Sequence, residues 1–258
     1  MPGNAARTPA YVWSSADTLG LLWMNPDPRM ALRVGGLVPL STTDYPDHLS
    51  AVVFCQGCPW RCAYCHNPHL LPRRGSAEMP WTEVLAFLER RRGLLDAVVF
   101  SGGEPTLQTK LPEAMRAVKA MGFKVGLHTA GIHPQRLALV LPLVDWVGMD
   151  VKAEFHNYAS LTGAPGSGER ARLSMELILA SSVAHEFRTT VHPDLLRGEA
   201  LERLAHALAS RGVRHYAVQE FRSAGCEGAE LRPAVSYLTD SFRAALAPLF
   251  ASLSVRRA

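Results

Sequence analysis

Short apolar runs alternate with amphipathic stretches along the chain from residue 51 onward. Runs rich in β-branched and aromatic residues predict six strands, at Ala51–Phe54, Ala97–Ser101, Lys124–His128, Trp146–Val151, Phe187–His192 and His215–Phe221. The stretches between them repeat apolar residues every three or four positions, which predicts helices near Thr82–Arg92, Leu111–Met121, Pro134–Val140, Glu169–Ala180 and Glu199–Ser210. A further helix is expected from about Ala234 to Phe250.

This alternation of strands and helices predicts an α/β fold built on parallel strands, because parallel strands need helical crossovers. Helix start signals support the assignment, such as Thr82 before Glu83 and the turn-rich segment Gly163–Gly168 before Glu169. Six repeats predict a partial TIM-like barrel of six βα units. An open flavodoxin-like sheet is the structural alternative.

Residues 1–35 show no clear periodicity, and they include Met24 and Met30. We expect an N-terminal extension over residues 1–35, followed by a single domain over residues 36–258. A chain of 258 residues is long enough for one sizeable core and short for two.

The composition is that of an ordinary globular protein, with 48% hydrophobic residues, 19% charged residues and a net charge of +4. The basic runs Arg90–Arg92 and Arg256–Arg257 are too short to favour nucleic acid as a partner. Pro142 and Asp145 interrupt the best candidate for a membrane span, and the N-terminus lacks the pattern of a secretory signal. We therefore expect a cytoplasmic protein that binds neither nucleic acid nor membrane.

Four of the five cysteines lie between residues 55 and 65. Cys58, Cys62 and Cys65 have the spacing C-x3-C-x2-C, with Tyr64 just before the last of them. Three thiolates on one short loop can hold three corners of an iron–sulfur cube and leave the fourth iron without a protein ligand. An open iron can bind a substrate or cofactor, whereas a fully ligated cluster mostly passes electrons.

Other roles for these cysteines follow from the same spacing. The pairs Cys55–Cys58 and Cys62–Cys65 could make a tetrahedral zinc site, although three intervening residues leave little room to wrap a metal ion. Disulfides are disfavoured, because a chain of this size needs no covalent cross-links. Cys55 fits a small buried residue at a strand end, and Cys226 fits an inert buried thiol.

Candidate binding residues follow the first three predicted strands. In folds with parallel strands, the chemistry lies where loops leave the carboxyl ends of the strands, and the cysteine loop follows the first strand directly. After the second strand, Gly102 and Gly103 can let backbone approach a ligand, and Glu104 can accept a hydrogen bond from an ammonium group. Paired glycines can equally form a simple turn. After the third strand, the hydroxyl of Thr129 can close a turn.

The fourth and fifth predicted strands end in charged side chains. Asp150 and Lys152 share one face, because alternate residues of a strand point the same way, and their opposite charges can pair. Arg188 and His192 are four residues apart and also share a face. Arg188 can grip a carboxylate with two hydrogen bonds, and His192 can reach a ribose hydroxyl. Tyr64 can pack near a cofactor ring or in the core.

The three-cysteine spacing and these strand-end residues resemble those of the radical S-adenosylmethionine enzymes. Longer segments resemble one group in that superfamily, the activating proteins of anaerobic ribonucleoside-triphosphate reductases, which are related to pyruvate formate-lyase activating enzyme. These segments are Gly35–Pro46, Cys65–Pro68, Met149–Lys152, Arg188–Pro193 and Gln219–Arg222. The resemblance covers roughly residues 34–232 and implies the same six-unit barrel.

The resemblance also implies two cofactors. A [4Fe–4S] cluster would be bound by Cys58, Cys62 and Cys65, and S-adenosyl-L-methionine would bind the open iron. Together with the strand-end reasoning, the resemblance gives a set of cofactor contacts, namely Tyr64, Gly102, Gly103, Glu104, Thr129, Asp150, Lys152, Arg188 and His192.

The activity implied by the resemblance is the installation of a glycyl radical on a partner enzyme, anaerobic ribonucleoside-triphosphate reductase. A flavodoxin- or ferredoxin-like protein would supply one electron, and no acid or base residue is needed beyond the cluster and the cofactor. Three alternatives follow from the sequence. These are activation of another glycyl-radical enzyme, radical modification of a small molecule or peptide, and a non-catalytic zinc or electron-transfer module.

Overall fold

The computed structural model describes residues 31–196, 198–223, 226, 231 and 238–257. One compact unit spans Leu32–Ala258, and its first strand, β1, spans Val34–Ser41. The predicted boundary after residue 35 falls inside this strand. Residues 1–30 of the predicted N-terminal extension lie outside the described residues.

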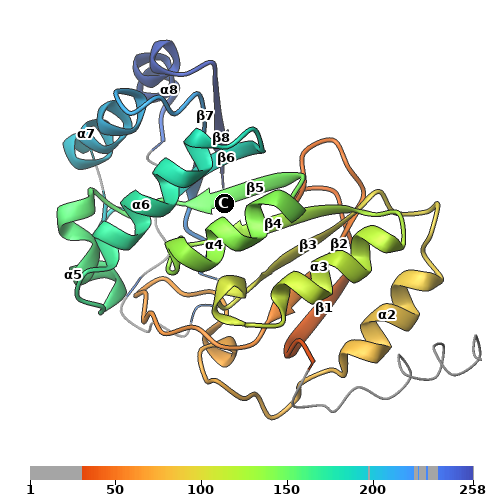
Figure 1. Cartoon of the computed structure of the whole chain (residues 1–258). Helices are drawn as coiled ribbons and strands as arrows, with labels where there is room; N and C mark the ends of the chain where they lie inside the picture. Colours follow the sequence, from red (N-terminus) through yellow and green to blue (C-terminus); the bar gives the residue numbers. More distant parts are fainter. Residues whose placement is uncertain (1–30, 197, 224–225, 227–230, 232–237, 258) are drawn as a thin grey trace, which may run out of the picture. The chain divides into compact units, whose positions relative to one another are not determined.

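The described residues form one eight-stranded sheet whose strands follow one another in chain order (Figure 1). The strands are β1 Val34–Ser41, β2 Ser50–Cys55, β3 Ala97–Gly102, β4 Lys124–Thr129, β5 Trp146–Asp150, β6 Ala184–Val191, β7 His215–Glu220 and β8 Ser252–Arg256. β1 runs antiparallel to β2, and every later pair is parallel. The six predicted strands are β2–β7, which confirms the predicted α/β class with six parallel βα units. A flavodoxin-like sheet would interrupt the chain order, so that alternative is wrong.

Two strands, β1 and β8, were not expected from the sequence. β1 contains Gly35, Gly36 and Pro39, which weaken a strand pattern and are tolerated because β1 lies at the edge of the sheet. β8 is short and half-buried at the opposite edge, so it lacks the apolar run of a central strand.

Helices connect the parallel strands, and α2, α3, α4 and α6 lie on one face of the sheet (Figure 1). The helices are α2 Trp81–Glu89, α3 Leu111–Ala120, α4 Pro134–Val140, α5 Tyr158–Thr162, α6 Ser167–Ala180, α7 Gly198–Ala209 and α8 Asp240–Leu246. Five lie close to predicted helices, and α5 was not predicted. The last helix, α8, is shorter than predicted, because a 3-10 turn at Ala247–Leu249 follows it. Residues 234–237 of the predicted helix lie outside the described residues. No helix in the described part of the chain is long and apolar enough to cross a membrane.

The inner face of the sheet, opposite the helices, is apolar at one end and polar at the other. Near the amino ends of the strands, Tyr45, Val52, Val99 and Trp146 form a buried apolar cluster with Ala97. One layer further along, His128 pairs with Gly148, and its Nδ1 lies 3.3 Å from Ser101 Oγ. The carboxyl ends of the strands therefore carry the polar groups, as expected for a site in a parallel α/β fold.

Candidate functional site

The cysteine loop leaves the carboxyl end of β2 and is held by backbone hydrogen bonds at both ends. The Gly57 amide donates to the Leu70 carbonyl at 2.8 Å, and the Cys58 amide donates to the Leu71 carbonyl at 3.1 Å. Further along, the Arg61 amide donates to the Thr162 carbonyl of α5 at 2.8 Å. These contacts fix the loop through its backbone and leave the thiols of the three predicted ligands partly exposed.

The four thiols of this region differ in burial. Cys58, Cys62 and Cys65 are free and partly exposed, whereas Cys55 is fully buried at the end of β2, as the sequence suggested. The predicted ligands are therefore accessible to an incoming metal group, and Cys55 is not. Cys226 is only partly buried, and its Sγ lies 3.8 Å from the Ala63 carbonyl, next to the same loop.

The chemistry of this donor set fits a cluster better than a single metal ion. Three accessible thiolates are one short of the four protein ligands that a structural zinc site takes, whereas they suffice to hold three irons of a cube and leave the fourth open. Burial raises the pKa of the Cys58 thiol to about 12 and also raises that of Cys62, a cost that iron binding offsets by stabilising the thiolates.

A buried donor in the loop points to the same conclusion. The indole of Trp60 is 1% exposed, and its Nε1 has no hydrogen-bond partner among the described residues. An unsatisfied buried donor costs about 1–3 kcal/mol, so a bound group with acceptor atoms would relieve it. The ring is fixed by an edge contact with Tyr158 of α5, at 5.9 Å between centroids.

The paired glycines after β3 bring that strand against the root of the cysteine loop. A Cβ on Gly102, whose φ is +104°, would lie 2.5 Å from the Cys55 amide nitrogen, and one on Gly103 would lie 2.4 Å from the Gly57 carbonyl oxygen. The Gly103 amide donates to the Cys55 carbonyl at 2.9 Å. The close backbone approach expected at Gly102 and Gly103 is therefore made to the chain itself.

Glu104 is a fully buried carboxylate that joins the ends of β3 and β4. Its Oε1 accepts from the Thr106 hydroxyl at 2.6 Å and from the Thr129 hydroxyl at 2.8 Å. Its Oε2 accepts from the Ala130 amide at 3.0 Å. Burial raises the pKa of Glu104, and these hydrogen bonds oppose the shift. Two predicted contact residues, Glu104 and Thr129, thus bind each other.

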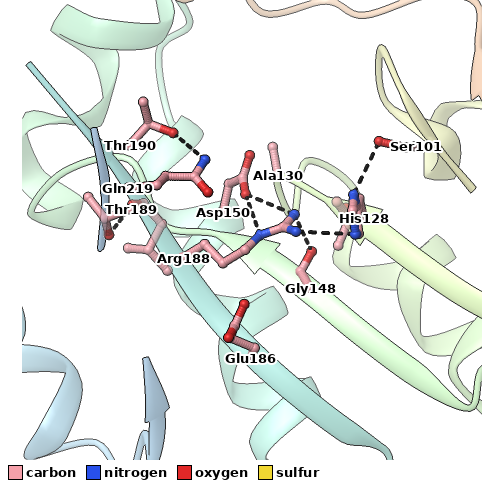
Figure 2. Close-up of polar contacts among 12 residues, drawn as sticks. Ser101, His128, Ala130, Gly148, Asp150, Glu186, Arg188, Thr189, Thr190 and Gln219 are labelled. Atoms are coloured by element: carbon pink, nitrogen blue, oxygen red, sulfur yellow. Dashed lines mark hydrogen bonds and ion pairs between the residues drawn. The ribbon is translucent and has the colours of Figure 1, made fainter. Parts of the chain in front are cut away.

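Asp150, Lys152 and Arg188 form one charged group at the ends of β5 and β6 (Figure 2 shows Asp150 and Arg188). Asp150 Oδ2 lies 3.6 Å from Lys152 Nζ, and Oδ1 lies 3.1 Å from Arg188 Nε. Lys152 Nζ also lies 5.3 Å from the centroid of the Tyr64 ring. Four predicted contact residues are therefore together, and Tyr64 ties them to the cysteine loop.

The charges in this group are fixed by their neighbours. Burial would raise the pKa of Asp150, but Arg188 and Lys152 lower it below its usual range. Burial would lower the pKa of Lys152, but Tyr64, Cys62 and Asp150 raise it well above its usual value. The site therefore holds one carboxylate between two cations, a net positive charge suited to an anionic or carboxylate-bearing ligand.

An aromatic stack links the cysteine loop to β6 and β7. His192 is 2% exposed and meets the Phe221 ring edge-on at 5.2 Å, and His66 stacks on Phe221 at 5.4 Å. His66 Nε2 lies 2.7 Å from the Arg222 carbonyl oxygen. The sequence predicted His192 but missed the role of Phe221, whose only signal is an aromatic residue directly after a strand.

Comparison with known proteins identifies the family. A family model described as the Radical SAM superfamily matches residues 52–211. This chain belongs to the radical SAM superfamily. The cofactors of this superfamily are a [4Fe–4S] cluster and S-adenosylmethionine, which confirms both predicted cofactors. The alternative of a non-catalytic zinc module is not supported.

Curated relatives include proteins named for the activation of glycyl-radical enzymes. The chain is 35% identical over 201 residues to the "Putative glycyl-radical enzyme activating enzyme" of Methanocaldococcus jannaschii, which covers 74% of this chain and 81% of the relative. It is 33% identical over 137 residues to the pyruvate formate-lyase-activating enzyme of Clostridium pasteurianum, which covers 51% of this chain and 57% of that enzyme.

Solved radical SAM structures share the fold. Streptococcus suis SuiB bound to S-adenosylmethionine superposes with a TM-score of 0.61 at 12% identity, over 79% of this chain and 48% of SuiB. QueE from Escherichia coli superposes with a TM-score of 0.52 at 17% identity, over 88% of this chain and 94% of QueE. Identities this low show the fold alone.

Proposed function

We propose that this chain installs a glycyl radical on anaerobic ribonucleoside-triphosphate reductase. The observation that carries the activating role is the 35% identity, over 74% of this chain, to a relative named as a glycyl-radical enzyme activating enzyme. The choice of the reductase as partner rests on segments of the sequence such as Gly35–Pro46 and Gln219–Arg222.

In this proposal, Cys58, Cys62 and Cys65 hold the cluster. When bound, the cluster and S-adenosylmethionine supply a one-electron reductive cleavage that releases a 5′-deoxyadenosyl radical. The three thiols support this role because they lie on one accessible loop whose backbone is already fixed. The chain itself then binds and orients the cofactor and keeps water away from the reacting atoms.

The proposed cofactor contacts fall into two kinds. Asp150, Lys152 and Tyr64 contact the cofactor through their side chains, because they adjoin the cysteine loop and their charges are fixed. His192 contributes from the end of β6, beside Phe221. The remaining residues contact the cofactor through backbone groups. Gly102 and Gly103 have no side chain, and the polar side-chain groups of Glu104 and Thr129 are bound to other parts of the protein.

The partner's glycine needs a way into the barrel. The described sheet runs from β1 to β8 without a pairing between these two end strands, so the strands do not close into a ring. In this proposal, an extended segment of the partner approaches the inner face of the sheet between these two end strands.

The electron donor in this proposal is a flavodoxin- or ferredoxin-like protein. Residues 48–77, which include the cysteine loop, contain no aspartate or glutamate. Arg61, Arg73 and Arg74 in this stretch are exposed, and none of them forms an ion pair among the described residues. A positive rim around the cluster loop favours a donor with an acidic surface.

The decisive experiment is radical transfer under anaerobic conditions. The reconstituted, reduced protein is mixed with S-adenosylmethionine and anaerobic ribonucleoside-triphosphate reductase, and the expected result is a glycyl-radical doublet in electron paramagnetic resonance. A Cys62→Ala variant is the control and should give no signal. A doublet on pyruvate formate-lyase but not on the reductase would keep the activating role and change the partner.

A second candidate function is radical modification of a small molecule. The chain is 34% identical over 126 residues to the 7-carboxy-7-deazaguanine synthase of Methanopyrus kandleri, which covers 41% of this chain. If S-adenosylmethionine is cleaved but neither glycyl-radical enzyme acquires a radical, this second candidate takes precedence.

A further inference from the structure

The pairing of β4, β5 and β6 builds a small polar layer on the inner face of the sheet. His128 pairs with Gly148, and Asp150 pairs with Arg188. Because alternate residues of a strand point the same way, His128, Gly148, Asp150 and Arg188 all face inward. Figure 2 shows the Arg188 side chain lying along this layer from Asp150 to His128.

Two of the three guanidinium nitrogens of Arg188 donate to protein acceptors. Its Nε donates to Asp150 Oδ1 at 3.1 Å, and its Nη2 donates to the Gly148 carbonyl at 3.3 Å. Its Nη1 lies 3.1 Å from His128 Nε2. Nη2 also lies 3.1 Å from Asp150 Oδ1, so two guanidinium nitrogens meet one and the same carboxylate oxygen.

Gly148 leaves the space in which the guanidinium lies. A Cβ on Gly148 would come within 2.9 Å of both Arg188 Cζ and Nη1, and within 2.7 Å of the Trp146 ring. The φ of Gly148 lies outside the left-handed region, so the backbone does not require glycine here. The missing side chain is therefore explained by the space that Arg188 and Trp146 occupy.

His128 closes the far end of this layer as a neutral ring. Burial and the neighbouring Arg188 lower its pKa to about 3, so the imidazole does not repel the guanidinium. Nε2 lies between Arg188 Nη1 and the Asp44 carbonyl oxygen, which is 2.8 Å away. Because a carbonyl oxygen can only accept, the neutral ring is the Nε2–H tautomer, which donates to Asp44, and its Nδ1 can accept from the Ser101 hydroxyl at 3.3 Å. The ring is thereby fixed in place beside the guanidinium.

The three charged side chains differ in how much they face outward. The Arg188 and Lys152 side chains are each 10% exposed, whereas the Asp150 side chain is 35% exposed. Asp150 is thus the member of the group with an open surface for a ligand, and Arg188 lies behind it.

We propose that Gly148 and His128 are positioning residues that hold Arg188 against Asp150, and that Arg188 acts on S-adenosylmethionine through Asp150 without contacting it. This inference rests on the proposed role of Asp150 in cofactor binding. One oxygen of Asp150 is held by Arg188, and the other, beside Lys152, is left to accept hydrogen bonds from the cofactor.

A double-mutant cycle on cofactor affinity tests the proposal. Affinity for S-adenosylmethionine is measured by equilibrium dialysis on reconstituted protein, together with iron content. We expect Gly148→Ala, His128→Leu and Arg188→Ala each to weaken binding about tenfold, in the middle of the range for coupled contacts. None of the three should weaken it further once Asp150→Asn is present. Additive losses of Arg188→Ala and Asp150→Asn would overturn the proposal, because a residue that acts only through Asp150 has no effect of its own once Asp150 is altered.

Two controls separate this outcome from other failures. Gly126→Ala introduces a Cβ 2.9 Å from Val99 Cγ2, one layer lower on β4 and away from Arg188, and should leave affinity unchanged at full iron content. An equal loss in Gly126→Ala would overturn the proposal as a general packing effect. Unchanged affinity of Asp150→Asn for S-adenosylmethionine would also overturn the proposal, because the proposal assumes that Asp150 binds this cofactor. Because the readout is binding, failure to activate a glycyl-radical enzyme would refute the proposed function and leave this test intact.

Discussion

The buried carboxylate of Glu104 joins two strand ends that lie 25 residues apart in the sequence. A side chain that accepts from the Thr106 hydroxyl, the Thr129 hydroxyl and the Ala130 amide cannot be replaced by its own amide without loss. A glutamine would turn one acceptor into a donor and set it against another donor.

We therefore expect Glu104→Gln to lower the free energy of unfolding of the apoprotein by about 1–3 kcal/mol. Urea unfolding followed by circular dichroism measures the change. Glu113→Gln on the exposed side of α3 is the control and should shift stability by less than about 0.5 kcal/mol. Equal stability of Glu104→Gln and the unmodified protein would contradict the idea that Glu104 stabilises the fold by joining the ends of β3 and β4.

The cysteines make a second prediction at the residue scale. Replacing Cys58, Cys62 or Cys65 by alanine should abolish the intact cluster, because the cluster needs all three thiolates as ligands. Cys55→Ala should retain it, because that thiol is fully buried in β2 and does not face the loop surface. Iron and sulfide analysis after anaerobic reconstitution measures both. Loss of iron in Cys55→Ala at unchanged apoprotein stability would mean that Cys55 is a ligand.

The residues of the site were only partly predictable from the sequence. The placement of Cys58, Cys62 and Cys65 on one accessible loop could be predicted because their spacing is local. The pairing of Asp150 with Lys152 could be predicted because alternation along one strand is local as well. The parts played by His128, Gly148 and Phe221 could not be predicted, because they depend on the register between strands. For the same reason, the engagement of Arg188 by Asp150 became visible only in the structure.

At the scale of elements, the central parallel strands were predictable and the edges were not. β2, β3 and β4 are mostly buried apolar runs bounded by turns, which is a strong strand signal. β1 contains two glycines and a proline, and α5 is only five residues long, so neither has a clear period. The most consequential contact between elements is the close approach of β3 to the root of the cysteine loop at Gly102.

We expect Gly102→Ala to destabilise the apoprotein more than Gly122→Ala. Both glycines have a left-handed φ, +104° and +93°, so both substitutions carry a backbone cost of about 1–2 kcal/mol. A Cβ on Gly122 meets nothing within 4 Å, whereas one on Gly102 meets the Cys55 backbone at 2.5 Å. Thermal unfolding measures the difference, and Gly102→Ala should also retain less iron. Equal losses in the two variants would show that only the backbone angle matters.

At the scale of the whole molecule, charge is unevenly distributed. The chain carries a net charge of +4, and residues 48–77 contribute only positive charge. Charge complementarity acts mainly on the rate of association and is screened by salt. The effect of the positive patch formed by Arg61, Arg73 and Arg74 should therefore appear in the rate at which a protein donor reduces the cluster.

Replacing Arg73 and Arg74 together by glutamate should slow cluster reduction by an acidic flavodoxin or ferredoxin by about tenfold at low salt. The difference should shrink at high ionic strength and should be absent with a small photoreduced deazaflavin. Arg116→Glu, an exposed change on α3, is the control. Stopped-flow absorbance of the cluster measures each rate. If Arg73→Glu with Arg74→Glu slows radical transfer even with deazaflavin, the patch binds the glycyl-radical enzyme instead.

The backbone of the cysteine loop is held at Gly57, Cys58 and Arg61 by hydrogen bonds to other parts of the chain. The third of these bonds reaches α5, a short helix that carries none of the predicted ligands. A disturbance of α5 is therefore passed through the backbone to the cysteines, and the cluster site extends well beyond the segment that contains its thiols.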